Sequence, residues 1–206
     1  MPLSFFHNNQ TVKQATQTTS HEITRKTNPK DQGLCLPLTN MYTEFQMGGG
    51  SHECIEGNSQ AIYERAISYR KKHENLRAPG RDYANPAFSA NENVSYSNRI
   101  VPASNVKSSD ALQESTIGRG PHSIITFKAK TPSKETAYHQ VGIGKDKQGQ
   151  EKCYFFDSNM RGFETVGSCE NIRNLAATMI ACQMAPEATD VLVASDEYSP
   201  TTRAMP

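Results

Sequence analysis

Two stretches in the first half of the chain repeat apolar residues at the spacing of an amphipathic helix. The first stripe runs from Leu34 to Phe45 and predicts a helix that begins at about Leu34 to Pro37, because proline is tolerated in the first helical turn. The glycine run 48–50 ends this helix. A second amphipathic helix is predicted over Ser59–Asn75.

The apolar pattern changes to that of β-strands after about residue 120. Ser168 is the predicted N-cap of a further helix that runs to about Ala185. Helices therefore come first, and an antiparallel sheet, a helix and a closing strand follow, which indicates an α+β domain. The predicted strands are Ser123–Lys130, Ala137–Gly144, Lys152–Asp157 and Asp190–Ala194.

Two segments are too polar to contribute much to a core. Residues 1–30 read as a flexible arm, and residues 77–110 read as a long loop or lid, followed by a short helix near Asp110–Ile117. Ile, Leu, Val and Phe supply only about 17% of the chain, a fraction that indicates disorder only when net charge is also high. The net charge is +1, so we expect one folded domain over residues 31–200.

Charge and hydropathy argue against nucleic acids and membranes as partners of this protein. Basic and acidic residues nearly balance, at 22 and 21, whereas nucleic-acid binders normally carry a basic excess. The longest apolar runs are about four residues, far below the length of a membrane-spanning helix. No nucleic acid, membrane segment or cofactor is expected.

The five cysteines are odd in number and irregularly spaced, so free thiols are the expectation. No Cys-x-x-Cys pair is present, and the neighbours His52 and Cys54 have no second ligand pair, so no metal site is expected. Three of the cysteines fall on apolar stripes and are expected in the core: Cys153, Cys169 and Cys182. His122, which follows a proline, is expected to be exposed.

Cys35 lies where the first helix begins. Unpaired N–H groups and the positive end of the helix dipole favour a thiolate at that position, as a nucleophilic cysteine requires. The alternative is a small core residue on an ordinary helix.

A hairpin in the second half brings a histidine near a carboxylate. If residues 147–149 form a three-residue loop with Gly149 in the left-handed position, His139 lies directly opposite Asp157, and both side chains share one face. A loop of two or four residues would put them on different faces. The pair is therefore either the base and orienting acid of a Cys-His-Asp site or a surface ion pair.

Three motifs resemble the YopT/AvrPphB-type cysteine proteases, effectors of papain-like fold that bacteria inject into host cells. They are Gly33–Leu38 before the first helix, Tyr138–Ile143, and Tyr154–Phe163, which contains Phe-Phe-Asp-Ser-Asn-Met-Arg-Gly-Phe. The resemblance spans residues 33 to about 182 in order and spacing. Ser158 and Arg161 depart from the family pattern.

The resemblance implies a papain-like fold with Cys35 as nucleophile, His139 as general base and Asp157 as its orienting partner. Gln32 is the candidate oxyanion donor beside the Cys35 backbone N–H. The resemblance also implies a host protein as substrate and secretion into the host cytosol. The arm 1–30 has the Ser/Thr/Asn/Gln-rich composition of export segments.

Three functions fit these residues. The first is a secreted effector cysteine protease that works through a thioester. The second is a glutamine deamidase or transglutaminase that uses the same three residues on a side-chain carboxamide. The third is a non-catalytic binding module that uses the 77–110 loop.

Overall fold

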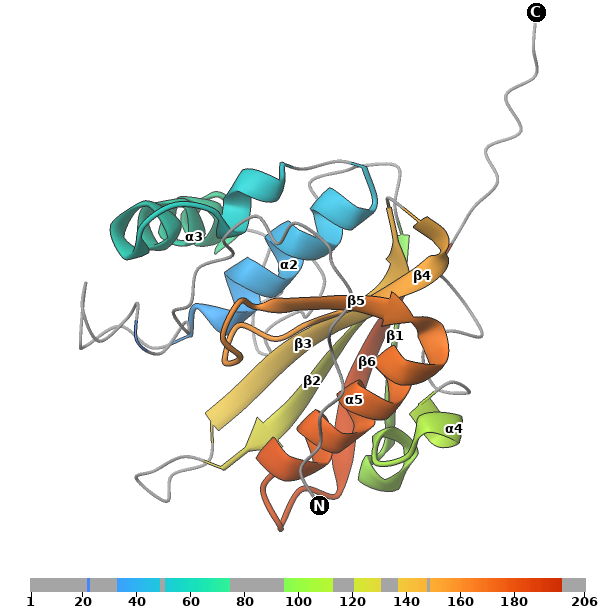
Figure 1. The fold of residues 1–206 in the computed structure, drawn as a ribbon. Coiled ribbons are helices and arrows are strands. Elements are labelled where there is room, and N and C mark those ends of the chain that lie inside the picture. Colours follow the sequence, from blue (N-terminus) through green and yellow to red (C-terminus); the bar gives the residue numbers. More distant parts are fainter. Residues whose placement is uncertain are drawn as a thin grey trace, which may run out of the picture.

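The chain folds around one antiparallel sheet with helices on both faces (Figure 1). This computed structural model describes residues 22, 33–48, 51–74, 95–112, 121–130, 137–147 and 149–197. Its helices are α2 (Cys35–Gln46), η1 (His52–Ile55), α3 (Ser59–Glu74), η2 (Ala103–Val106), α4 (Ser109–Leu112) and α5 (Cys169–Gln183). Its strands are β1 (Ser95–Pro102), β2 (His122–Ala129), β3 (Ala137–Asp146), β4 (Gly149–Phe156), β5 (Glu164–Ser168) and β6 (Asp190–Glu197).

The strand order is β1-β6-β2-β3-β4-β5, and every neighbouring pair is antiparallel. The predicted α+β class, with N-terminal helices packed on a central antiparallel sheet, is confirmed. The helices predicted from apolar periodicity are present within about two residues at each end. Ser168 caps α5 as predicted, because its hydroxyl accepts a hydrogen bond from the Asn171 N–H at 3.4 Å.

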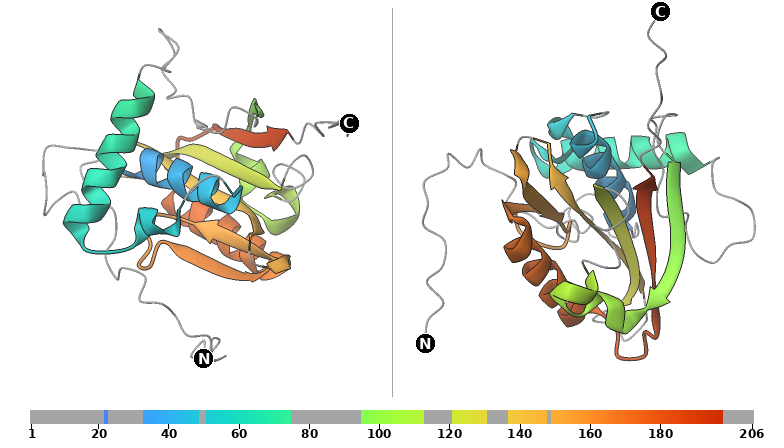
Figure 2. Two further views of the ribbon diagram at one scale, coloured as in Figure 1. Left: turned by 90° about the horizontal axis from the view of Figure 1, so that it is seen from above. Right: turned by 90° about the vertical axis from the view of Figure 1, so that its right-hand side faces the viewer.

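The alternation of side chains along the strands builds two cores. On one face, Ile143 and Phe155 pack with Ile172 and Ile180 of α5. On the other face, Tyr154 and Phe156 pack with α2, η1 and α3. Figure 2 shows these layers, with α2 and α3 on one side of the sheet and α5 on the other.

The prediction of a long loop over 77–110 is wrong in its second part, because residues 95–102 form β1 and 103–112 form two short helices. Among the described strands, β1 lies at the edge of the sheet and its one neighbour is β6. An edge strand can be buried on one face and exposed on the other. In β1, Val101 is buried, whereas its neighbour Ile100 is 63% exposed. Its polar sequence therefore resembled a loop. The first part of that segment, 77–94, and the predicted arm, apart from residue 22, lie outside the described residues.

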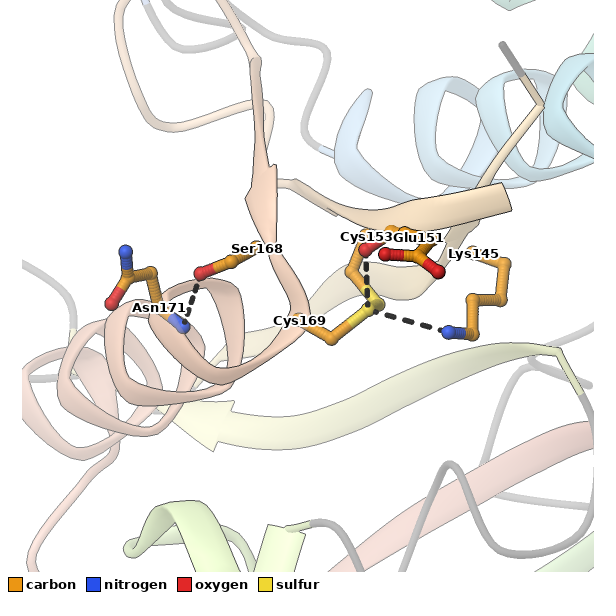
Figure 3. Close-up of a disulfide and its surroundings, with 6 residues drawn as sticks. All are labelled: Lys145, Glu151, Cys153, Ser168, Cys169 and Asn171. Carbon is orange, nitrogen blue, oxygen red and sulfur yellow. Dashed lines mark hydrogen bonds between the residues drawn. A yellow bond between two sulfur atoms is a disulfide. The ribbon is translucent and has the colours of Figure 1, made fainter. Parts of the chain in front are cut away.

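The prediction of five free thiols is also wrong. Cys153 and Cys169 form a disulfide, with their Cα atoms 4.7 Å apart. β4 and β5 are hydrogen-bonded neighbours, and Cys153 pairs with Gly167, so the first residue of α5 comes beside it. Figure 3 shows this bridge, with the Lys145 ammonium 3.5 Å from the Cys169 sulfur.

Two further burial predictions are wrong. Cys182 is exposed rather than in the core, because it lies on the solvent side of the last turn of α5. His122 is only 7% exposed rather than on the surface, because it is the first residue of β2 and its ring stacks on Tyr154. Burial lowers the pKa of His122 to about 4.

Candidate active site

Cys35 is the first residue of α2, and it is partly exposed. The Leu34 carbonyl accepts the first helical hydrogen bond from the Leu38 N–H, so the Cys35 N–H has no partner within the helix. The Cys35 thiol donates to the Tyr138 carbonyl at 3.9 Å, which places the sulfur at the beginning of β3. Tyr138 directly precedes His139.

His139 and Asp157 are in direct contact. His139 Nε2 lies 2.8 Å from Asp157 Oδ1, and the two side chains are 4% and 0% exposed. Asn159 Nδ2 lies 3.4 Å from His139 Nδ1. The ring therefore presents Nε2 to a buried carboxylate, and Nδ1 has a different neighbour.

The predicted hairpin register that led to this pair is wrong by two positions. It placed Ile143 opposite Cys153, whereas Ile143 pairs with Phe155. The register shifts next to the turn, since Lys145 pairs with Cys153 but Asp146 pairs with Gly149. A shift of two residues keeps each side chain on its face of the sheet, because side chains alternate with a period of two.

The contact is consequently made by a loop rather than by directly opposed strand residues. Asp157 follows the last residue of β4, and its N–H donates to the Phe163 carbonyl at 2.8 Å. Gly162 and Phe163 both have positive φ, at 81° and 60°, which turns the chain back toward β5. Phe163 is fully buried in the α2-side core, so the turn is fixed by packing as well as by hydrogen bonds.

Electrostatics favour a charged pair between the cysteine and the histidine. Loss of water around the Cys35 sulfur by itself raises the pKa, but the hydrogen bond and charge attraction from His139 outweigh it, and the pKa of Cys35 lies below its ordinary value. Burial lowers the pKa of His139, yet hydrogen bonds with Asp157 and Cys35 raise it to about 10.

The Asp157 carboxyl is ionised in this arrangement. Burial by itself raises its pKa, but hydrogen bonds from His139, Gln183 and the Asn159 backbone bring the pKa below its ordinary value. The three side chains can therefore hold a thiolate, an imidazolium and a carboxylate together near neutral pH.

Close packing of α2 on β3 fixes the distance between the cysteine and the histidine. Thr39 Oγ1 donates to the Gln140 carbonyl at 3.1 Å, and Asn40 Nδ2 lies 3.4 Å from Gln140 Oε1. A Cβ added to Gly142 would lie 3.2 Å from Thr43 Oγ1, so the helix approaches the strand closely where a side chain is missing.

A second polar cluster joins the other end of α2 to η1 and β5. His52 lies 2.7 Å from Glu56 and 3.1 Å from Glu164, and Tyr42 donates to Glu164. The hydrogen bond with Glu164 raises the pKa of His52, whereas burial lowers it. The hydrogen bond with Glu56 raises it further, and the net effect is a pKa of about 9. This cluster holds the α2 layer together.

Within the described residues, no group of three or more His, Cys, Asp or Glu side chains is placed to hold a metal ion. No helix of the described part of the chain is long and apolar enough to cross a membrane.

Comparison with known proteins gives a remote similarity of structure. The sequence matches no protein-family model and no curated protein. Its structure is similar to the crystal structure of the Pseudomonas avirulence protein AvrPphB, at 12% identity and a TM-score of 0.48, over 84% of this chain and 94% of that chain. A similarity this remote assigns no activity.

The structure thus brings Cys35, His139 and Asp157 to one place, and the candidate oxyanion donor Gln32 lies outside the described residues. Sequence reasoning did not find Gln183, the last residue of α5, whose amide donates to Asp157 Oδ2 at 2.5 Å. No motif marks this glutamine, because the contact joins two segments that meet only in the folded chain.

Proposed function

We propose that this protein is a papain-like thiol protease in which Cys35 is the nucleophile, His139 the general base and acid, and Asp157 the group that orients His139. The observation that carries the proposal is the position of the Cys35 thiol. It lies at the start of α2 and against Tyr138, the strand residue that precedes His139. His139 in turn is hydrogen-bonded to the buried Asp157. A cysteine at the start of a helix, followed along the chain by a histidine on a sheet strand and then by an aspartate that reaches it, is the papain-like order of functional groups.

The proposed reaction is acyl transfer in two steps. The Cys35 thiolate attacks the carbonyl carbon of a peptide bond and forms a C–S bond. The C–N bond then breaks, and the His139 imidazolium gives its proton to the departing amine. In the second step His139 takes a proton from water, the hydroxide attacks the thioester, and the C–S bond breaks to release the acid.

The Cys35 N–H supports stabilisation of the intermediate. It has no acceptor in the helix and lies at the positive end of the α2 dipole, where negative charge on an oxygen is favoured. We assign the second donor to Gln32, on the basis of its position three residues before Cys35.

A shallow hollow on the sheet supports a polypeptide as substrate. It lies across β1, β6, β2 and β3 and is lined among others by Ile100, Leu192 and Tyr138. Tyr138 also accepts a hydrogen bond from the Cys35 thiol through its carbonyl. Ile100 and Tyr138 are 63% and 43% exposed, which leaves apolar surface for a substrate side chain.

We further propose that the substrate is a protein of a host cell and that the protease reaches it by bacterial export. This part of the proposal rests on the resemblance of the three motifs to injected effector proteases.

The test compares the wild-type protein with Cys35→Ala on extracts of host cells, with new protein N-termini and intact masses measured by mass spectrometry. We expect N-termini that appear with the wild type and with the control Cys182→Ser, which lacks the exposed thiol, but not with Cys35→Ala. A mass gain of about 1 Da on glutamine without new N-termini would replace proteolysis by deamidation. Identical products from the wild type and Cys35→Ala would overturn both thiol-dependent reactions.

A further inference from the structure

The Asp157 carboxylate is held by three hydrogen bonds, and they divide unequally between its oxygens. Oδ1 accepts from His139 Nε2 and from the Asn159 N–H, each at 2.8 Å. Oδ2 accepts from Gln183 Nε2 at 2.5 Å. The Gln183 amide therefore sets the rotation of the carboxylate about the Cβ–Cγ bond, which two bonds to one oxygen leave free to change.

Backbone hydrogen bonds hold Gln183 in place independently of its side chain. Its carbonyl accepts from the Lys130 N–H at 2.8 Å, and the Ala185 N–H donates to the Lys128 carbonyl at 2.9 Å. The end of α5 is thus hydrogen-bonded to the end of β2, and the amide reaches Asp157 from an anchored backbone. A donor that is fixed in advance costs little conformational entropy when it bonds the carboxylate.

The charge at this point matters because Asp157 is fully buried. A buried carboxylate that loses a hydrogen-bond donor is less stable as the anion, and a neutral aspartic acid cannot stabilise an imidazolium. His139 in turn is the group that stabilises the Cys35 thiolate. A substitution of Gln183 should therefore change the reactivity of Cys35, through its effect on Asp157 and His139.

We propose that Gln183 is a positioning residue of the active site: it holds the Asp157 carboxylate ionised and in the plane that His139 requires. The proposal rests on the proposed function, since it assigns Gln183 a role in the same group of side chains.

The test follows the reaction of Cys35 with iodoacetamide across pH 5 to 9, by mass spectrometry of the alkylated peptide, which requires no substrate. Gln183→Met keeps the length of the side chain and removes the donor. We expect its Cys35 alkylation at pH 6 to fall about 10-fold, with the pH profile displaced upward by about one unit. Gln183→Lys supplies a donor again and should return the profile toward that of the wild type.

Thr178→Ala serves as the control, because Thr178 is an exposed residue of α5 whose hydroxyl donates within its own helix, to the Asn174 carbonyl at 2.8 Å. Its profile should equal that of the wild type, and melting temperatures of all variants separate loss of stability from loss of positioning. A wild-type profile in Gln183→Met, with or without a lower melting temperature, overturns the positioning role and leaves the proposed function intact. Failure of the proposed function would give a different result, in which Cys35 of the wild type reacts no faster at pH 6 than the exposed Cys182.

Discussion

His139 Nε2 lies 2.8 Å from Asp157 Oδ1, and both side chains are buried although neither residue lies opposite the other in the β3–β4 ladder. Asp157 reaches the ring from the turn that follows β4. A buried imidazole next to a buried carboxylate has a specific consequence: the charged form of each group depends on the other.

Asp157→Asn removes the charge and keeps the shape of the side chain. We expect the pKa of His139, which its hydrogen bonds raise to about 10 against the effect of burial, to fall by more than one unit, as measured by NMR of the imidazole protons. Turnover of any substrate should fall about 10²- to 10⁴-fold. Asp110→Asn, an exposed change on α4, should alter neither quantity. An unchanged His139 titration in Asp157→Asn would contradict the electrostatic coupling.

The reactivity of Cys35 should persist at acidic pH. Because interactions with His139 lower the pKa of Cys35, iodoacetamide should modify it at pH 6 at least about 10-fold faster than Cys182. Cys54 should remain unmodified in the folded protein, since burial raises its pKa to about 12. In His139→Ala the advantage of Cys35 at pH 6 should disappear. Equal and slow labelling of Cys35 and Cys182 in the wild type would refute a thiolate at the helix start.

The His52 cluster should make stability depend on pH in a defined direction. The pKa of His52 is raised to about 9 in the folded protein, above its unfolded value of about 6.5, so its contribution is fully present below about pH 6.5 and is lost as pH rises through about 9. His52→Gln should cost about 1–2 kcal/mol at pH 6, reduced by solvent screening of a partly exposed group, and little at pH 10.

Denaturant unfolding at several pH values measures this difference. The same substitution in a Glu164→Gln background should cost less at pH 6, because the main partner of His52 is then neutral. A cost for His52→Gln that is independent of pH would show that the ring acts by packing on Tyr42 and Phe45 alone.

The Cys153–Cys169 disulfide should stabilise the fold. It closes a loop of 16 residues, for which restriction of the unfolded chain predicts about 3 kcal/mol. A reducing agent should lower the melting temperature of the wild type, whereas Cys153→Ala/Cys169→Ser should melt at one temperature with or without it. The iodoacetamide reaction of Cys35 serves as the check on the active site. An identical melting temperature for oxidised and reduced wild type would rule out this contribution.

Gly162→Ala should destabilise the turn that carries Asp157. Gly162 has a φ of 81°, where a Cβ clashes with the backbone, so we expect a loss of about 1 kcal/mol in unfolding experiments. Gly57→Ala is the matched control for strain at a positive φ, 97°, in a turn far along the chain from Asp157. It should lose similar stability while Cys35 alkylation changes only in Gly162→Ala.

Local patterns in the sequence were sufficient for the helices α2, α3 and α5 and for the two faces of β3 and β4. The apolar stripe from Leu34 to Phe45, with proline in its first turn, placed Cys35 at the beginning of α2. The alternation along β3 and β4 put Val141, Ile143 and Phe155 on one buried face. Both signals arise within a few residues of chain, where the period of a helix or strand determines which side chains share a surface.

Contacts between distant segments were decided only by the tertiary structure. The polar strand β1 is stable because β6 supplies its hydrogen bonds, and Cys153 meets Cys169 because β4 and β5 are neighbours. The register of the β3–β4 hairpin depends on an irregularity beside its turn. Gln183 reaches Asp157 because the end of α5 is tied to β2.

The sequence by itself therefore determined the α+β class, the helix-start position of Cys35, and the shared face that permits a His139–Asp157 pair. The tertiary structure decided how that pair is held, from the turn after β4 and from the end of α5. Periodicity is a property of the local backbone and is visible in the residues themselves. The partners of a buried polar atom depend on which segments pack together, and that depends on the free energy of the whole fold.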